Sequence, residues 1–574
     1  MKTKFFIFTL LLFNLSVFSQ SANFNWVRQD STRYDQRSAN IKTITDYQNN
    51  LYTVGYFYGE IFFDSNTSLI GGGYGESYSY IKKTDSYGNL LWAKLIGEGG
   101  DNYVSDILET NENGNNYLYI SGFFHGTVDF DNSINTHSYT TDDYYFAGFL
   151  LKLDSNGNFI WVKIFDNPQK EDFVFSIDSD SQNNIIVTGF TDSLNYPFLF
   201  DTNYEFDGFF SKLLISKIDI NGNIVWNFDT PYNNGMVAGI SVKTDSQNNV
   251  IVSGTFNHQV SFGLSNNFIT HGNQYSTDIF ILKLDENSNY IWAKQVGGLY
   301  NDGASQMVLD SNNDIYIRGF FKDTVDFDPD TNNSFILYGG GSGNADSDTY
   351  LLKLDNDGNF QWVNHFPRMT CNAITYNNNK IIVSVINYLN INHFINTFYN
   401  TIQLPYDNSG YYQHYILDFN IDGHFNNFVH LITGTGVTQD SQLTVKDINF
   451  NNNSLLLTGF FLYSINFGDN HILNSYGNFS NFVLSLHYDT NSIQTIDNHS
   501  INIYPNPVME NLYVSNNSNE TFTTTEIYDI LGKLISSKTN IENNINVSNL
   551  PNGFYILKLS NDKTSITKKF IVKH

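Results

Sequence analysis

Tryptophan recurs along this chain at nearly constant spacing. The tryptophans are six in number: Trp26, Trp92, Trp161, Trp226, Trp292 and Trp362. The differences between successive positions are 66, 69, 65, 66 and 70 residues. A fixed period of this size is typical of repeat architectures, in which similar units bury their apolar faces against one another. The chain is therefore expected to be an array of related units.

Each tryptophan from the second onward follows a short polar turn that begins with an acidic residue. The five turns are Asp85-Ser-Tyr-Gly-Asn, Asp154-Ser-Asn-Gly-Asn, Asp219-Ile-Asn-Gly-Asn, Asp285-Glu-Asn-Ser-Asn and Asp355-Asn-Asp-Gly-Asn. Asn-Gly and Asp-Gly between apolar runs predict hairpins, because these residues tolerate positive φ. An apolar run such as Phe149–Asp154 precedes each turn, so a hairpin joins that strand to the tryptophan strand.

Two further strands complete the predicted unit. One resembles Val174–Asp180, and the next resembles Ile185-Ile-Val-Thr-Gly-Phe190. The glycine of this second strand recurs at positions 55, 122, 189, 254, 319 and 459, and Val385 takes its place in the sixth copy. Aromatic residues make up 16% of the chain and charged residues only 15%, which favours strands and tight turns. The sequence therefore predicts an all-β fold with seven units of four strands.

The two ends of the array predict how it closes. The repeats open with a lone tryptophan strand, Asn23–Arg28, and the seventh copy ends at Phe482–Leu486 without a tryptophan strand after it. The first strand is therefore expected to complete the last sheet, which removes an open edge. The sixth copy lacks its glycine, and Asn427-Phe428 stands where the opening tryptophan of the seventh copy is expected, which predicts less regular units at this end.

The repeat over residues 23–488 resembles bacterial seven-bladed β-propeller repeats. The resemblance rests on Lys-Leu-Asp-x-Asn-Gly-Asn-x-x-Trp followed by an apolar strand and Ile-x-Ile-x-Gly. It implies a seven-bladed β-propeller whose four-stranded blades are closed by the N-terminal tryptophan strand. It implies nothing about the ligand, because propellers host many functions.

The C-terminal segment resembles a second family, the type A sorting domain of the type IX secretion system. The matching segments are Ile501–Val508, Leu512–Val514, Glu526–Lys533, Leu550–Leu557 and Lys568–Val572. The resemblance implies a small β-sandwich that binds the type IX secretion machinery and directs a folded cargo across the outer membrane. It leaves open whether the sorting domain is cleaved and whether the protein is released or anchored.

The ends and the charge complete the predicted organisation. Lys2 and Lys4, the apolar run Phe5–Leu15 and the small residues before position 20 predict a signal peptide. We therefore expect a signal peptide at 1–19, a propeller at 20–490, a linker at 491–500 and the sorting domain at 501–574. No later run is apolar enough to predict a transmembrane segment. The net charge of −27 makes nucleic-acid binding unfavourable.

An acidic run in the fifth copy is the candidate metal site. Asp326, Asp328, Asp330 and Asn332 place oxygen ligands at alternate positions, as calcium loops do, so calcium is the one cofactor that the sequence suggests. The glycine and distal glutamate of an EF-hand loop are missing. The alternative is that these residues cap turns between strands.

The remaining candidates favour structural interpretations. A repeated tryptophan is expected to pack between adjacent units rather than to bind a ligand. Cys371 is expected to be a small buried residue, not a nucleophile. The histidines show no metal-binding spacing, and no Gly-x-Ser-x-Gly elbow is present, so the sequence supports no catalytic residue.

Two functions are the main candidates for this sequence, and a structural surface component is a third. The first is an exported, non-catalytic binding or adhesion module, secreted or attached at the cell surface, whose ligand is a glycan or a surface protein. The alternative is a secreted polysaccharide lyase or hydrolase with a site in the propeller funnel. The sequence does not identify the ligand.

Overall fold

The computed structural model contains only strands, turns and loops in its described part, without an α-helix. It describes residues 23–32, 37–72, 75–131, 133, 135–141, 145–193, 210–230, 232–263, 266–273, 276–330, 332–340, 347–387, 394–404, 413–431, 443–451, 454–467, 472–488, 501–516, 522–529, 534–539, 544–560 and 565–574. The predicted signal peptide and linker lie outside these residues. The chain divides into two compact units, residues 1–488 and 489–574.

The first unit consists mainly of antiparallel sheets, and seven of them, among the described residues, share one four-strand order. The first strands are β2 (Ser38–Thr45), β8 (Asp101–Glu112), β14 (Glu171–Ser179), β19 (Val237–Thr244), β25 (Gly303–Leu309), β31 (Met369–Asn377) and β37 (Leu443–Asn451). The second strands are β3 (Leu51–Tyr58), β9 (Asn115–His125), β15 (Ile185–Ser193), β20 (Val250–Asn257), β26 (Ile315–Phe321), β32 (Lys380–Asn387) and β38 (Ser454–Asn466).

The other two strands of each sheet form the predicted hairpin. The third strands are β6 (Ser77–Thr84), β12 (Ala147–Asp154), β16 (Lys212–Ile218), β23 (Thr277–Leu284), β29 (Asp348–Leu354), β35 (Gln413–Asn420) and β39 (Ile472–His487). The fourth strands are β7 (Leu90–Ile96), β13 (Phe159–Phe165), β17 (Ile224–Asn227), β24 (Tyr290–Gly298), β30 (Phe360–Phe366), β36 (Phe425–Leu431) and β1 (Asn23–Thr32). Asn427 pairs with Asp418 where the tryptophans pair with lysines, as the sequence alignment of the copies predicts.

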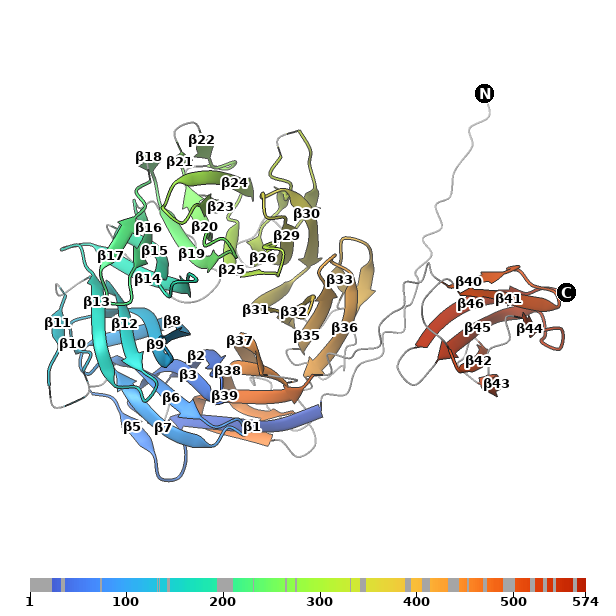
Figure 1. Cartoon of the computed structure of the whole chain (residues 1–574), viewed down its shortest axis with the longest axis horizontal. Helices are drawn as coiled ribbons and strands as arrows, with labels where there is room; N and C mark the ends of the chain where they lie inside the picture. The colour runs from blue at the N-terminus through green and yellow to red at the C-terminus, as the bar shows by residue number, and fades with distance from the viewer. Residues whose placement is uncertain are drawn as a thin grey trace. The chain divides into compact units, whose positions relative to one another are not determined.

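The first strands lie against one another in chain order. Each contacts the first strand of the next sheet, and β37 contacts β2. Figure 1 shows these strands toward the middle of the unit and the fourth strands toward its periphery. The apolar cores lie between adjacent sheets; one cluster, for example, joins Val54 and Ile81 to Val104 and Phe149 of the next sheet.

The N-terminal strand completes the last sheet, and this confirms the predicted pairing. β1 runs antiparallel to β39, with Trp26 opposite Ser485 and Gln29 opposite Phe482. The indole of Trp26 then contacts the first sheet: its Nε1–H donates to the Ser86 carbonyl at 3.1 Å, in the turn between β6 and β7. The strand therefore joins the last sheet to the first.

The turns before the tryptophans differ in detail from the expected hairpins. In Asp85–Asn89, Asp85 accepts backbone N–H bonds from Tyr87 and Asn89, and only the fourth residue, Gly88, has a positive φ (76°). The Asp85 N–H donates to the Asn89 carbonyl and the Gly88 N–H donates to the Asp85 carbonyl, both at 2.9 Å, which identifies a three-residue loop with a glycine bulge. Gly88 packs on Trp26, since an added Cβ would lie 2.7 Å from its ring.

The recurring glycine of the second strand lies opposite a bulge. Each first strand has a register shift, for example between Val104 and Asp106, which pushes a carbonyl toward the glycine. A Cβ on Gly122 would stand 2.1 Å from the Tyr103 oxygen, and one on Gly189 would stand 1.9 Å from the Phe173 oxygen. Glycine therefore recurs at this position because a carbonyl oxygen of the first strand lies too close for any side chain.

Short hairpins are inserted between the second and third strands; three of them extend the preceding sheet, whereas β10 and β11, and β21 with β22, belong to small separate sheets. β4 (Glu60–Phe62) pairs with β1, β27 (Thr324–Asp326) pairs with β24, and β33 (Phe394–Asn396) pairs with β30. We call these inserts the rim hairpins. Their other strands are β5 (Ser68–Ile70), β10 (Thr127–Asp129), β11 (Ser138–Thr140), β21 (Gln259–Gly263), β22 (Asn266–Ile269), β28 (Ile336–Tyr338) and β34 (Thr401–Gln403), and β18 (Tyr232–Asn234) pairs with β21.

The second unit contains two sheets around an apolar core. One sheet has the order β40 (Ile501–Tyr504), β41 (Asn511–Asn516), β44 (Asn544–Asn546). The other has the order β43 (Leu534–Thr539), β42 (Thr524–Asp529), β45 (Gly553–Ser560), β46 (Ser565–Val572). Leu512, Leu557 and Phe570 are buried between them.

Replacing Trp26 with alanine tests the contact between the last and first sheets. Trp26 is 9% exposed, and the variant loses its packing and its bond to Ser86. We expect a destabilisation of about 3–5 kcal/mol, measured by urea unfolding, as for other buried tryptophans. Leu91→Ala, at a position 54% exposed on β7, is the matched control and should cost less than about 1 kcal/mol. Equal midpoints for the two variants would contradict the role of Trp26.

Candidate functional site

The predicted acidic run lies in a rim hairpin, in and after β27. Val325 and Phe327 are buried, while Asp326 and Asp328 alternate with them on the partly exposed side and Asp330 is exposed. Phe327 contacts Phe321 and Tyr350 in the core below. The apolar residues thus anchor the loop, and the carboxylates face away from the core.

Each carboxylate of the run accepts a backbone N–H two residues further on. Asp326 accepts from Asp328 at 3.1 Å, Asp328 from Asp330 at 3.0 Å, and Asp330 from Asn332 at 3.0 Å. Asp326 also accepts from Phe335 at 2.8 Å, which closes the loop. The bond from Asn332 lowers the pKa of Asp330. These bonds match the turn-cap interpretation.

The second rim hairpin repeats this arrangement. Asp129 accepts the backbone N–H groups of Asp131 and His137, and Asp131 accepts that of Ser133. No group of three or more acidic, histidine or cysteine side chains in the described part of the chain is arranged to hold a metal ion. Calcium binding by Asp326, Asp328, Asp330 and Asn332 therefore stays a prediction.

Polar residues just after the bulges link the first strands, and no sequence motif predicts these links. Asp106 accepts the N–H of Ile177 at 3.0 Å, Ser241 that of Met307 at 3.2 Å, and Gln306 that of Ile374 at 3.2 Å. Lys42 forms an ion pair with Asp106. Burial alone would lower the pKa of Lys42, but the charges of Asp106 and Asp447 outweigh it and raise the pKa.

The tryptophans and Cys371 have structural positions, as expected. The Nε1–H groups of Trp161, Trp226 and Trp362 donate to carbonyls in the turn of the next sheet at 3.0–3.2 Å. Cys371 is 2% exposed, and burial raises the pKa of its thiol to about 12. A thiol with this pKa is a poor nucleophile at neutral pH.

The rim hairpins also carry exposed apolar side chains. Tyr139 is 40% exposed, Tyr338 72%, Ile269 62% and Ile70 70%. The five-residue turns that join first to second and third to fourth strands, such as Asp46–Asn50 and Asp85–Asn89, are called the Asp/Asn turns here. The four exposed residues lie at the opposite end of the sheets, because successive strands are antiparallel. Exposed apolar side chains also occur at the Asp/Asn-turn end, where Tyr47 and Tyr87 are 77% and 69% exposed, so exposure is common to both ends of the sheets.

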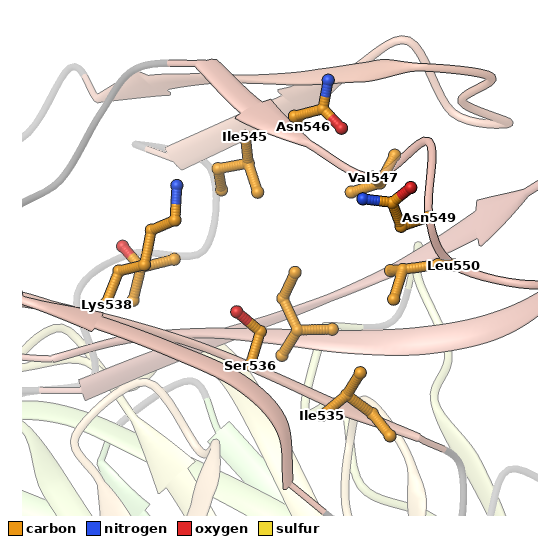
Figure 2. A pocket seen from close by; sticks show the side chains of 10 residues that line it. Ile535, Ser536, Lys538, Ile545, Asn546, Val547, Asn549 and Leu550 are labelled. Carbon is orange, nitrogen blue, oxygen red and sulfur yellow. The ribbon is translucent and has the colours of Figure 1, made fainter.

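The second unit has a groove between its two sheets, with a volume of about 350 Å³ (Figure 2). Its apolar lining consists of Ile527, Ile535, Ile545, Val547 and Leu550. Lys538 is the one charged residue of the lining. Figure 2 shows Ile545 and Val547 on one side of the gap and Ser536 and Lys538 on the other.

The family comparison identifies the second unit. Residues 502–573 match the family described as the secretion system C-terminal sorting domain. This match confirms the resemblance inferred from Ile501–Val508 and the later segments. The chain is accordingly exported through type IX secretion, to the cell surface or the medium. In the part of the chain that the structure describes, no helix has the length and apolar character needed to cross a membrane.

The other comparisons are distant. An uncharacterized WD repeat-containing protein, L264, from Acanthamoeba polyphaga mimivirus is 22% identical over 377 residues, 55% of this chain and 26% of that protein. The chain thus spans about a quarter of this relative's length.

Three solved structures are also similar to the chain. PorZ, described as a surface component of the type-IX secretion system of Porphyromonas gingivalis, is 9% identical with a TM-score of 0.20, covering 96% of this chain and 100% of PorZ. The extracellular domain of BT4673 from B. thetaiotaomicron is 10% identical with a TM-score of 0.18, covering 95% and 99%. A xylan beta-1,4-xylosidase from Bacillus halodurans is 7% identical with a TM-score of 0.24, covering 82% and 97%. Scores this low carry no argument about this chain.

Calcium binding is tested by thermal unfolding in chelator and in millimolar calcium. If Asp326, Asp328, Asp330 and Asn332 bind calcium, the ion should raise the melting temperature. Asp328→Asn should reduce that gain. Asp64→Asn, at a capping carboxylate of another rim hairpin, is the control and should leave it unchanged. If calcium does not change the melting temperature of the parent protein, calcium binding is excluded and the acidic residues only cap turns.

Glu171 gives the first unit a predictable pH dependence. Burial, with a contribution from Asp172, raises the pKa of Glu171 to about 7, although its carboxylate accepts the Phe146 N–H at 2.8 Å. The folded state therefore holds a proton that the unfolded state has lost between about pH 4.5 and 7, so stability falls as pH rises through this range.

Glu171→Gln keeps an acceptor for Phe146 and removes the charge. We expect the variant to melt higher than the parent at pH 8 and to differ little from it at pH 4. Thermal unfolding at both pH values measures this. A variant that melts lower than the parent at pH 8 would contradict the raised pKa.

Proposed function

We propose that residues 20–490 form a seven-bladed β-propeller that acts as an exported, non-catalytic binding or adhesion module. Residues 491–500 serve as a linker and 501–574 as the sorting domain that delivers the propeller. The ligand is a glycan or a surface protein.

The propeller proposal is supported by the order of contacts in the first unit. The seven four-stranded sheets follow one another, and their first strands contact in sequence from β2 to β37 and back to β2. β1 supplies the fourth strand of the last sheet, and Trp26 reaches the first. A propeller is the architecture that uses such repetition to leave short, protected edges.

The difference between the two ends of the sheets carries the binding proposal. One end has nearly identical five-residue turns, such as those that begin at Asp85, Asp154 and Asp219. The opposite end has rim hairpins that vary in length and sequence. Binding residues are commonly placed on variable connections held by a rigid scaffold. The exposed side chains Tyr139 and Tyr338 belong to this end.

Tyrosine suits such a surface, because it offers a rigid apolar ring and a polar hydroxyl at low entropic cost. The net charge of −27 disfavours polyanionic ligands. A neutral glycan or a protein patch that accepts aromatic contacts fits these properties best.

The test compares exposed tyrosines at the two ends. The secreted parent is screened against a glycan array and against intact cells, beside Tyr139→Ala/Tyr338→Ala and the control Tyr47→Ala/Tyr87→Ala. Tyr47 and Tyr87 are 77% and 69% exposed but lie in the Asp/Asn turns. We expect the rim variant to lose about tenfold or more in affinity and the control to bind normally. Equal loss in both would contradict the rim surface. Release of oligosaccharides from a bound polysaccharide would favour the hydrolase or lyase alternative.

A further inference from the structure

A buried ion pair joins the N-terminal strand to the first sheet. Asp30 lies on β1 and is 2% exposed, and Lys82 lies on β6 and is 3% exposed. The ammonium nitrogen of Lys82 lies 2.6 Å from Oδ1 and 2.5 Å from Oδ2 of Asp30. The ring centroid of Phe63 lies 5.6 Å from the same nitrogen. Because β1 completes the last sheet, this pair spans the junction between the last sheet and the first.

The other junctions between sheets have no such pair at these two positions. Four of them place both equivalent residues in one apolar cluster: Ile96 with Leu151, Val296 with Leu352, Phe366 with Leu417, and Leu431 with Leu484. At the remaining two, the equivalent residues are Phe165 with Ser216 and Thr230 with Leu282. The equivalence follows from the ladders, since Lys82 pairs with the residue after Trp92 as Leu151 pairs with the residue after Trp161. Only the junction made by β1 has two charges there.

An ion pair alone is a poor replacement for these apolar contacts. Two charges lose their hydration on burial, and apolar residues of similar volume usually stabilise a core equally well or better. The fold itself uses the apolar solution at four junctions. A reaction that converts the two charges into one neutral group would remove the cost of burying them.

The surroundings of Asp30 favour its reaction with an amine. Burial raises the pKa of Asp30, against the opposing effects of Lys82 and Asn40. A raised pKa favours transfer of a proton from the ammonium to the carboxylate, which gives an amine and a carboxylic acid in contact. Groups held this close react much faster than the same groups free in solution.

We propose that Lys82 and Asp30 condense to a side-chain amide that joins β1 covalently to β6. Lys82 Nζ forms a bond to Asp30 Cγ, and one C–O bond of the carboxyl group breaks. The oxygen leaves as water with two of the three ammonium protons, and the amide nitrogen keeps the third. The two side chains thus supply every atom of the products. Cys371 is the one cysteine of the chain, so a disulfide within the chain cannot stabilise this junction.

Lys283 and Asp245 form an internal control for this reaction. Both are buried, and Nζ of Lys283 lies 2.9 Å from Oδ2 of Asp245. The Asp245 carboxylate also accepts the backbone N–H groups of Gln247 and Asn249 at 2.9 Å each. Burial alone would raise the pKa of Asp245, but hydrogen bonds from Asn249, Lys283 and Gln247 outweigh it and lower the pKa. This carboxylate stays ionised, so we expect no amide here.

Peptide mass spectrometry of the full chain tests the bond directly. The folded protein is purified, denatured and digested with trypsin. We expect a branched peptide that joins the segments containing Asp30 and Lys82, is lighter than their sum by one water molecule, and is not cleaved after Lys82. The segments containing Asp245 and Lys283 should be linear. Linear peptides with a free Asp30 and a free Lys82 would overturn the proposal.

Lys82→Arg provides a second measurement on the intact chain. Arginine keeps the positive charge and stays protonated, so it does not form the amide. The variant should be heavier than the parent by the mass of the substitution plus one water molecule. A difference equal to the substitution alone would also overturn the proposal.

The double variant Asp30→Ile/Lys82→Leu tests whether the bond stabilises the junction. It introduces the residue pair found at Ile96 and Leu151 and cannot form the amide. If Lys82 and Asp30 formed only an ion pair, this change should leave the stability equal or raise it. The crosslinked parent should instead unfold at a higher urea concentration than the variant, because the bond restricts the unfolded chain. A variant that unfolds at or above the midpoint of the parent would overturn the stabilising role.

Discussion

The antiparallel pairing of β1 with β39 is the interaction on which the first unit depends most. It joins residues more than 450 positions apart, such as Trp26 and Ser485. Without it, the sheet of β37, β38 and β39 would lack its fourth strand, and the turn at Ser86 would lose the indole that binds it. Such a contact carries a large loop-closure cost, which a ladder of backbone hydrogen bonds and a buried tryptophan can offset.

The contact of a tryptophan with the turn of the next sheet recurs between neighbouring sheets, and this explains the spacing of the tryptophans in the sequence. A tryptophan from one sheet packs on the glycine of the next sheet's turn, as Trp161 does on Gly222. Its N–H and the ammonium of Lys152 both bind the carbonyl of Ile220 in that turn. The tryptophan, the lysine and the turn glycine therefore belong to one contact, although they lie in two copies of the repeat.

These shared contacts determine how much of the fold can be predicted from the sequence. The turns, the tryptophans and the extra N-terminal strand were all predictable, because each repeats with a fixed chemical signature. The rim hairpins were not recognised as strands that extend a neighbouring sheet, since pieces of three residues such as Thr324–Asp326 have no periodicity to detect. The acidic run is evident in the sequence. The structure adds that each of its carboxylates accepts the backbone N–H of the residue two positions further on.

The rim hairpins explain how the outer strands of several sheets are protected. β4 and β5 extend β1, β27 and β28 extend β24, and β33 and β34 extend β30. An outer strand with unpaired backbone groups can pair with another chain, so each short hairpin shields the strand that it extends. The hairpin comes from the following copy of the repeat, as the turn that binds each tryptophan does. Two contacts therefore tie each of these sheets to the next one, the tryptophan at the Asp/Asn-turn end and the rim hairpin at the opposite end.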